Sequence, residues 1–81
     1  MRISVVFYSY FRELTGCPNV SLELPDGAAI VQLIGSLQER FPKLKAMEKS
    51  TLIAVGVEYQ PRDHVLHDGD EVSLFPPVQG G

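Results

Sequence analysis

Hydrophobic and polar residues alternate with a period of two in four segments of the chain. This alternation, rich in β-branched residues, is typical of β-strands. It predicts strands over residues 2–8, 20–24, 52–57 and 71–75. The first segment carries apolar residues on both faces, which indicates a central strand. Residues 64–67 form a further candidate, a short edge strand. Between these elements we expect a loop or a short turn of helix over residues 43–50, a turn and connection over residues 58–63, and a tight turn over residues 68–70.

One segment has the spacing of an amphipathic helix. Its apolar residues would form a single stripe that belongs to the core: Ile30, Leu33, Ile34, Leu37 and Phe41. Pro42 predicts the end of this helix. Ala28 and Ala29 stand where a capping side chain would be expected, and its absence costs about 1 kcal/mol. Gly35 costs about another 1 kcal/mol relative to Ala inside a helix.

The order of these elements is strand, strand, helix, strand, short strand, strand. The first two strands form an antiparallel hairpin, and the helix is long enough to connect parallel strands by a right-handed crossover. The sequence therefore predicts an α+β, β-grasp (ubiquitin-like) fold, with a mixed sheet of about 4–5 strands and one main helix packed on one face. We expect the first and last strands to lie side by side in the middle of this sheet. We expect a β-grasp domain over residues 1–75 and a flexible diglycine tail over residues 76–81.

The last six residues are suited to entering a pocket of another protein. Pro76 and Pro77 fix φ and favour an extended, polyproline-like path. Gly80 and Gly81 lack a Cβ and can pass where a bulkier chain cannot. The Gly81 carboxylate is the only reactive group at the tip. Six extended residues reach about 20 Å, which is enough to enter an active site.

Phe75 stands next to this tail, on the last strand. If Val72 and Leu74 point into the core, Phe75 points to the opposite face, because side chains alternate along a strand. An exposed aromatic side chain beside a functional tail is a candidate interface anchor.

Composition narrows the range of functions. The chain has 81 residues, 44% of them hydrophobic and 21% charged, which fits one folded domain. Its net charge of −3 argues against nucleic acid as the main partner. No apolar run reaches membrane-spanning length, and we expect no signal peptide. The single cysteine, Cys17, fits a reducing, cytoplasmic setting and leaves no internal disulfide.

The chain shows no conventional active site. His64 and His67 are three residues apart and would face opposite sides of a strand, so we predict no metal site there. Cys17 has no evident activating neighbour and is interpreted as an incidental thiol. No phosphate-binding loop, catalytic triad or metalloprotease pattern is present.

Four motifs, spread over the whole length, carry a resemblance to a known family. They are Arg12-Glu13-Leu14-x-Gly16, Leu24-Pro25-Asp26-Gly27, Leu66-x-Asp68-Gly69-Asp70-Glu71-Val72 and Phe75-Pro76-Pro77-Val78-x-Gly80-Gly81. Together they resemble the small subunit of molybdopterin synthase, a sulfur carrier of the ubiquitin-like β-grasp type. The terminal motif is the most specific. The chain departs from the family at Ala29, where a capping Thr or Ser is frequent.

The resemblance implies a carrier that is not itself catalytic. An activating enzyme, an adenylating sulfurtransferase, would use ATP in trans to convert the Gly81 carboxylate into an acyl-adenylate and then a thiocarboxylate (1-thioglycine). The thiocarboxylate would donate sulfur to a cyclic pyranopterin precursor during molybdenum cofactor biosynthesis. The catalytic residues would lie on the large synthase subunit, in a heterotetramer. No tightly bound cofactor or metal is expected.

The resemblance also assigns the partner-binding residues. They are the six that precede the terminal glycine: Phe75, Pro76, Pro77, Val78, Gln79 and Gly80. Val78 could pin the tail in an apolar cleft, and the prolines lower the entropy lost on binding. Two alternatives stay open: a sulfur carrier for thiamine, amino acid or tRNA thiolation, and a ubiquitin-like modifier or binding module. The Phe-Pro-Pro-Val stretch favours molybdopterin synthesis.

Overall fold

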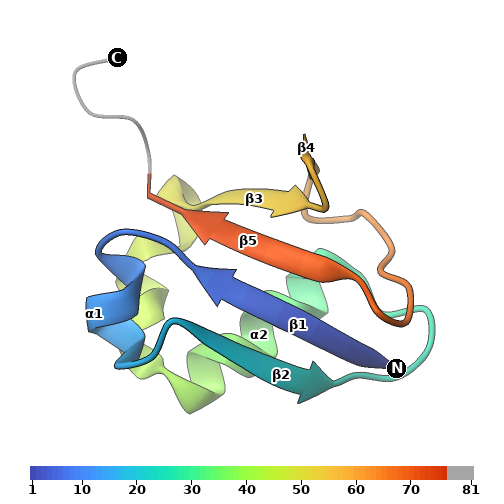
Figure 1. Cartoon of the computed structure of the whole chain (residues 1–81), viewed down its shortest axis with the longest axis horizontal. Coiled ribbons are helices and arrows are strands. Elements are labelled where there is room, and N and C mark those ends of the chain that lie inside the picture. The colour runs from blue at the N-terminus through green and yellow to red at the C-terminus, as the bar shows by residue number, and fades with distance from the viewer. Residues whose placement is uncertain (77–81) are drawn as a thin grey trace.

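A five-stranded mixed sheet forms the centre of the protein (Figure 1). The computed structural model describes residues 1–76, except the side chains of Met47 and Glu48. The strands are β1 (Arg2–Phe7), β2 (Asn19–Glu23), β3 (Leu52–Val55), β4 (Glu58–Tyr59) and β5 (Glu71–Phe75). The helices are α1 (Phe11–Thr15), α2 (Ile30–Arg40) and the 3₁₀ helix η1 (Pro42–Ser50).

The first and last strands lie side by side in the middle of the sheet, as predicted. The strand order is β2-β1-β5-β3-β4. β1 pairs parallel with β5, with Val5 opposite Val72, and antiparallel with β2. β5 continues antiparallel with β3, which forms a hairpin with β4. The predicted β-grasp fold is therefore confirmed, including the parallel central pair.

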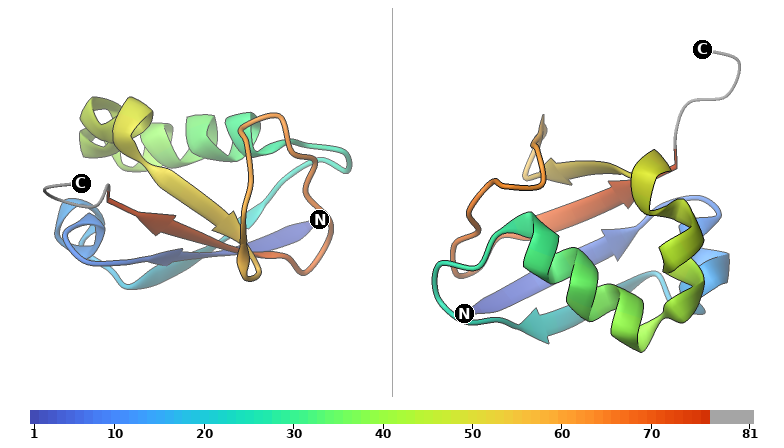
Figure 2. Two further views of the ribbon diagram at one scale, coloured as in Figure 1. Left: turned by 90° about the horizontal axis from the view of Figure 1, so that it is seen from above. Right: turned by 180° about the vertical axis from the view of Figure 1, so that it is seen from behind.

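α2 covers one face of the sheet, and the opposite face is left open (Figure 2). The predicted stripe of α2 is buried through Leu37, and Phe41 packs edge-on against Phe7 with ring centroids 5.8 Å apart. Leu44 anchors η1 to the same core with only 7% of its surface exposed. Residues 43–50, predicted as a loop or a short turn of helix, belong to the longer 3₁₀ helix η1.

The start of α2 is capped by a distant part of the chain. Ala29 has no capping side chain, but its own N–H donates to Oε1 of Gln32 at 2.5 Å. The next two N–H groups donate to the carbonyls of His64 and Arg62, at 3.0 and 2.8 Å. These bonds satisfy donors that would otherwise lack partners in the first turn. The predicted loss from the missing cap is therefore largely offset.

The segment after β3 differs from the prediction. The strand ends at Val55, because Gly56 adopts φ of +63° and Val57, 99% exposed, completes a two-residue turn. A Gly in the first central position suits such a hairpin. The residues interpreted as a connection, Glu58 and Tyr59, form the edge strand β4.

Residues 64–67, predicted as the edge strand, do not form one. They make only an isolated bridge, between Ala29 and Val65. The reason is that the backbone carbonyls of this connection cap α2 and are not free to extend the sheet. The turn predicted at residues 68–70 is confirmed, with Gly69 at φ of +86° and the Asp68 carboxylate accepting the Arg2 N–H at 2.8 Å.

Candidate functional site

β5 delivers the chain to one end of the domain, where the tail begins. Val72 and Leu74 are buried, with 0% and 2% exposure, whereas Phe75 is half-buried on the other face. The predicted orientation of Phe75 is thus confirmed. Pro76 is the last described residue and follows directly from this central strand (Figure 1). Pairing on both sides of β5 holds the base of the tail in place.

Two tyrosines join Phe75 on the open face of the sheet. Tyr8 follows β1 and stacks on Phe75, with ring centroids 4.5 Å apart and planes inclined by 14°. Tyr59, from β4, meets the Phe75 ring edge-on at 6.2 Å. A backbone hydrogen bond from Tyr8 N–H to the Leu74 carbonyl, at 3.2 Å, fixes the stacked pair. We call Tyr8, Tyr59 and Phe75 the aromatic patch.

The aromatic patch has the properties of a binding surface. Tyr8 is 37% exposed and Tyr59 68% exposed, and the neighbouring Leu52, which pairs with Phe75 across the sheet, is 38% exposed. Aromatic rings offer a large contact area at low entropic cost and are enriched where interfaces are most strongly stabilised. Their position at the base of the tail suits a partner that takes up the tail.

Sequence reasoning missed both tyrosines. Tyr8 was assigned to the first strand without a role, although its register with Phe75 follows from the parallel pairing of the first and last strands. The sequence predicts a connection at Tyr59 and gives no indication that this side chain lies on the sheet. The alternation of side chains after Val6, taken together with the predicted topology, could have identified Tyr8 as a neighbour of Phe75 on the open face of the sheet.

The other predicted tail residues lie outside the described part of the chain. These are Pro77, Val78, Gln79, Gly80 and Gly81. Their assignment as partner-binding residues, and that of Gly81 as the reactive residue, stays a prediction. The division between a domain at residues 1–75 and a tail at residues 76–81 also stays a prediction. The structure places Phe75 and Pro76 at the point from which such a tail would leave.

Within the described part of the chain, the remaining candidate groups do not form a metal site. Within residues 1–76, no three His, Cys, Asp or Glu side chains come together as metal ligands. His67 is 79% exposed and lies 4.0 Å from the Asp70 carboxylate. Cys17 is half-buried, and its carbonyl accepts a hydrogen bond from the Thr15 hydroxyl at 3.0 Å.

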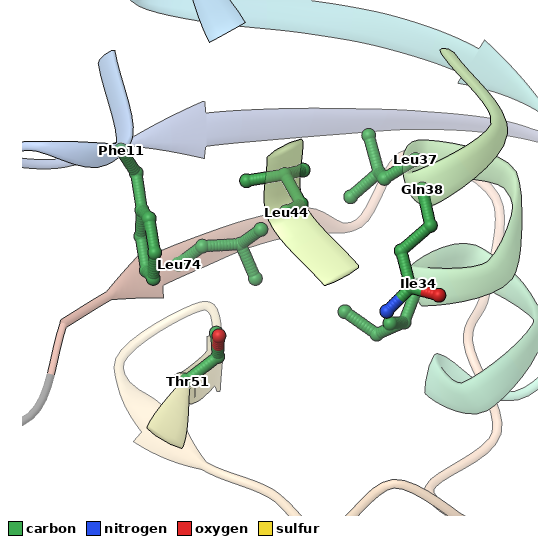
Figure 3. A pocket seen from close by; sticks show the side chains of 7 residues that line it. All are labelled: Phe11, Ile34, Leu37, Gln38, Leu44, Thr51 and Leu74. Carbon is green, nitrogen blue, oxygen red and sulfur yellow. The ribbon is translucent and has the colours of Figure 1, made fainter. Parts of the chain in front are cut away.

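A small cleft opens between α2, η1 and the end of β5 (Figure 3). Its lining is apolar apart from one amide and one hydroxyl: Phe11, Ile34, Leu37, Gln38, Leu44, Thr51 and Leu74. The space open to a water-sized sphere is about 10 Å³, enough for roughly one water molecule. None of the seven lining residues has an ionisable side chain, so this cleft is not suited to acid–base chemistry.

No helix among the described residues is long and apolar enough to cross a membrane.

Comparisons with known proteins agree with this arrangement. The ThiS family model matches residues 5–81. The molybdopterin synthase sulfur carrier subunit of Chlamydomonas reinhardtii is 36% identical, with the whole of both chains covered. A structure from Pyrococcus furiosus assigned as molybdopterin converting factor subunit 1 is 34% identical, with a TM-score of 0.89 and coverage of 96% of this chain and 99% of that one.

A further structure contains a second protein. It is a complex of subunits 1 and 2 of the molybdopterin-converting factor from Helicobacter pylori, 26% identical with a TM-score of 0.70, and all of both chains is covered. The family model and the similarity to named carriers thus extend over the central sheet, the aromatic patch and the terminal residues. The chain belongs to the ThiS family, together with the molybdopterin synthase sulfur carrier subunits.

Proposed function

We propose that this chain is the sulfur carrier subunit of molybdopterin synthase. The observation that carries the proposal is the similarity to sulfur carrier subunits over the complete chain, including the terminal Gly80-Gly81. The fold supports it, because the tail begins at the end of a central strand that is held on both sides. A rigid base and a narrow tip allow the terminal carboxylate to be presented inside a partner.

The chemistry takes place at Gly81. A carboxylate is a poor electrophile, so an activating enzyme first transfers AMP from ATP to it and releases pyrophosphate. A sulfur donor then displaces AMP from the acyl-adenylate and leaves a thiocarboxylate. This sulfur attacks the cyclic pyranopterin precursor, and two such transfers supply the two sulfurs of the dithiolene. Splitting the transfer into activated steps is the general logic of covalent carriage.

The large synthase subunit is the partner in which this sulfur is used. The solved complex between subunits 1 and 2 of a related converting factor supports such a pairing. We assign Phe75 and Tyr8 to the docking surface and residues 76–80 to the segment that enters the large subunit. The acids and bases of the reaction then lie on the large subunit, and two copies of each subunit form a heterotetramer.

Two further features belong to the proposal. The activating enzyme, with its ATP, acts in trans, so the carrier itself needs no tightly bound cofactor. A cytoplasmic location fits a chain with one cysteine, Cys17, and no disulfide.

Reconstitution tests this function. The chain carrying a Gly81 thiocarboxylate is mixed with the large subunit and the cyclic pyranopterin precursor, and the dithiolene product is quantified. We expect about two carriers to be consumed per product, because each carrier delivers one sulfur. The same chain with an unmodified carboxylate is the control. Absence of product, in the presence of a large subunit that works with its own carrier, would contradict the proposal.

A further inference from the structure

Positive charge is concentrated in one short segment of this acidic protein. Residues 40–50 hold four of the seven basic residues and one of the ten acidic residues, which gives a net charge of +3. The rest of the chain holds three basic and nine acidic residues, which gives −6. The basic segment comprises the end of α2 and all of η1. Every lysine of the protein lies in η1, and we call Lys43, Lys45 and Lys49 the basic ridge.

The geometry of η1 directs the basic ridge outward. Leu44 is buried between two exposed lysines and fixes the helix on the core. In a 3₁₀ helix, residues three apart lie on the same side, so Lys43 and Lys49 share one face. Six residues at about 2 Å each separate the two backbone positions by about 12 Å. A 3₁₀ helix of nine residues is unusually long, since most runs contain only three or four residues.

Among the side chains that the structure describes, which exclude that of Glu48, no acidic group forms an ion pair with a lysine of the basic ridge. The ion pairs formed between described residues involve the N-terminal amine with Asp26, Arg2 with Glu23 and His67 with Asp70. None of these pairs includes a lysine. Three cations on one short helix repel one another, which slightly raises the electrostatic energy of the free protein. Binding of a negatively charged surface would offset this repulsion.

The basic ridge stands at the same end of the domain as the base of the tail. η1 ends at Ser50, two residues before Leu52, which pairs with Phe75. Figure 2 shows η1, α1 and the end of β5 together at this end. The aromatic patch lies on the open face of the sheet, whereas η1 belongs to the helical layer. The two surfaces therefore flank Pro76 from opposite sides.

A groove extends the basic ridge along the helical layer. It has a volume of about 380 Å³ and is lined by Val31, Ile34, Lys49 and Arg62. Val31 is 56% exposed and gives the groove an apolar wall. The Arg62 guanidinium donates to the Thr51 carbonyl at 3.5 Å and forms part of the wall. This surface suits a partner segment that combines carboxylates with an aliphatic side chain.

We propose that the basic ridge docks an acidic surface of the large synthase subunit, beside the opening that admits the tail. The inference rests on the proposed function, since it names the same partner. Charge complementarity carries it, because residues 40–50, with a net charge of +3 in an acidic chain, lie at the same end of the domain as the end of β5, where the tail begins (Figure 2). A nucleic-acid partner fits less well, since three lysines neutralise few phosphates and the remaining net charge is repulsive. The aromatic patch supplies most of the affinity, and the basic ridge guides the approach.

This division of roles predicts a kinetic effect. Complementary charge raises association rates by about 10 to 10³-fold at low ionic strength and loses this effect in salt. Contacts between exposed charges add little to the free energy of the bound complex. We therefore expect the basic ridge to change the association rate constant much more than the dissociation rate constant.

The test measures binding to the purified large subunit by stopped flow at about 20 and 300 mM salt. In the double variant Lys43→Gln with Lys49→Gln, we expect the association rate constant at low salt to fall about five- to tenfold. The dissociation rate constant should change less than twofold. The variant should lose most of the salt dependence that the unmodified chain shows. Thermal melting checks that both proteins remain folded, which we expect because both lysines are exposed.

A matched control separates a local effect from net charge. Arg2→Glu changes the net charge by the same two units, at the far end of β1 (Figure 1). We expect its association rate constant to remain within about twofold of the unmodified chain. Equal slowing by the control and the double variant would contradict a local docking role. Unchanged association by the double variant, with lost binding to phosphatidylserine vesicles, would assign the ridge to a membrane surface and overturn the proposal.

The two proposals fail in different ways. If the unmodified chain binds the large subunit at a rate independent of salt, the basic ridge does not dock there, but the carrier function stands. If the unmodified chain does not bind the large subunit at any salt concentration, the proposed function fails and the inference fails with it.

Discussion

Replacing Phe75 by Ala separates the role of the aromatic patch in binding from its role in folding. The substitution removes the ring that stacks on Tyr8 at 4.5 Å and meets Tyr59 edge-on at 6.2 Å. It leaves the backbone pairing of β5 unchanged, because the ladder bonds involve main-chain atoms. It also leaves the tail sequence intact, so any change in binding comes from the patch.

The two expected effects differ in size. Phe75 is only half-buried, so the loss of its contacts should lower the free energy of unfolding by about 1–2 kcal/mol, below the 3–5 kcal/mol of a fully buried Phe. For a domain of this size each kcal/mol shifts Tm by about 4–8 °C. Removing an aromatic anchor from the centre of an interface costs about 2 kcal/mol or more of binding free energy, which raises Kd roughly 30-fold.

Two measurements on the Phe75→Ala variant give its change in stability and its change in affinity. Thermal or urea denaturation gives the free energy of unfolding, and calorimetric titration with the large subunit gives Kd at a temperature well below Tm. Val65→Ala is a matched control, since Val65 is 47% exposed and lies in the connection that borders α2, away from the patch. We expect this control to bind like the unmodified chain.

The reasoning would be refuted by a Kd for Phe75→Ala within about threefold of the unmodified chain. A second informative variant is Tyr8→Phe, which keeps the stacked ring and removes only the hydroxyl. If Tyr8→Phe weakened binding as strongly as Phe75→Ala, the patch would act through a hydrogen bond and not through its aromatic surface.

Further predictions concern stability and the tail. Gly35→Ala should raise the free energy of unfolding by about 0.5–1 kcal/mol, because Gly35 is exposed in α2 and an added Cβ meets nothing within 4 Å; a lower Tm would show strain that the structure does not contain. Gln32→Ala should lower it by about 0.5–1.5 kcal/mol, since the Ala29 N–H loses its acceptor; unchanged urea denaturation would mean that water replaces the bond at no cost. Deletion of Gly81 should abolish sulfur transfer and leave Tm nearly unchanged, and a large loss of stability would show that the tail is structural.

The central part of the fold could be predicted because its signals are local and mutually consistent. The stripe from Ile30 to Leu37 admits only a helix with one buried face. Alternation in the first and last strands fixes which side chains meet that helix. Once a hairpin and a helical crossover are placed, few topologies remain, and the parallel central pair follows.

The errors lie where backbone contacts between distant residues decide the structure. Residues 64–67 look like a strand, but the His64 and Arg62 carbonyls accept bonds from the start of α2. The absence of an edge strand at residues 64–67 and the tolerance of Ala29 without a side-chain cap thus have one cause, because the backbone carbonyls of this connection bond to the start of α2. Composition cannot reveal such an exchange, because every residue can accept, and every residue except proline can donate, a hydrogen bond through its backbone.

The sequence predicted the tail and Phe75 but missed Tyr8 and Tyr59, the other two members of the aromatic patch. The diglycine and the two prolines are informative by themselves, because their conformational properties do not depend on the rest of the chain. The aromatic patch depends on register: Tyr8 and Phe75 are far apart in sequence and meet only because β1 and β5 pair in parallel. The basic ridge likewise required the position of η1 relative to β5.

The central claim is that Gly81 carries sulfur as a thiocarboxylate. The most direct test is the intact mass of the chain after incubation with its activating enzyme, ATP and a sulfur source. We predict a mass increase equal to the replacement of one oxygen by one sulfur, located by fragmentation at Gly81 and lost in the chain that lacks this residue. An unchanged mass, with an activating enzyme that modifies its own carrier under the same conditions, would contradict the account.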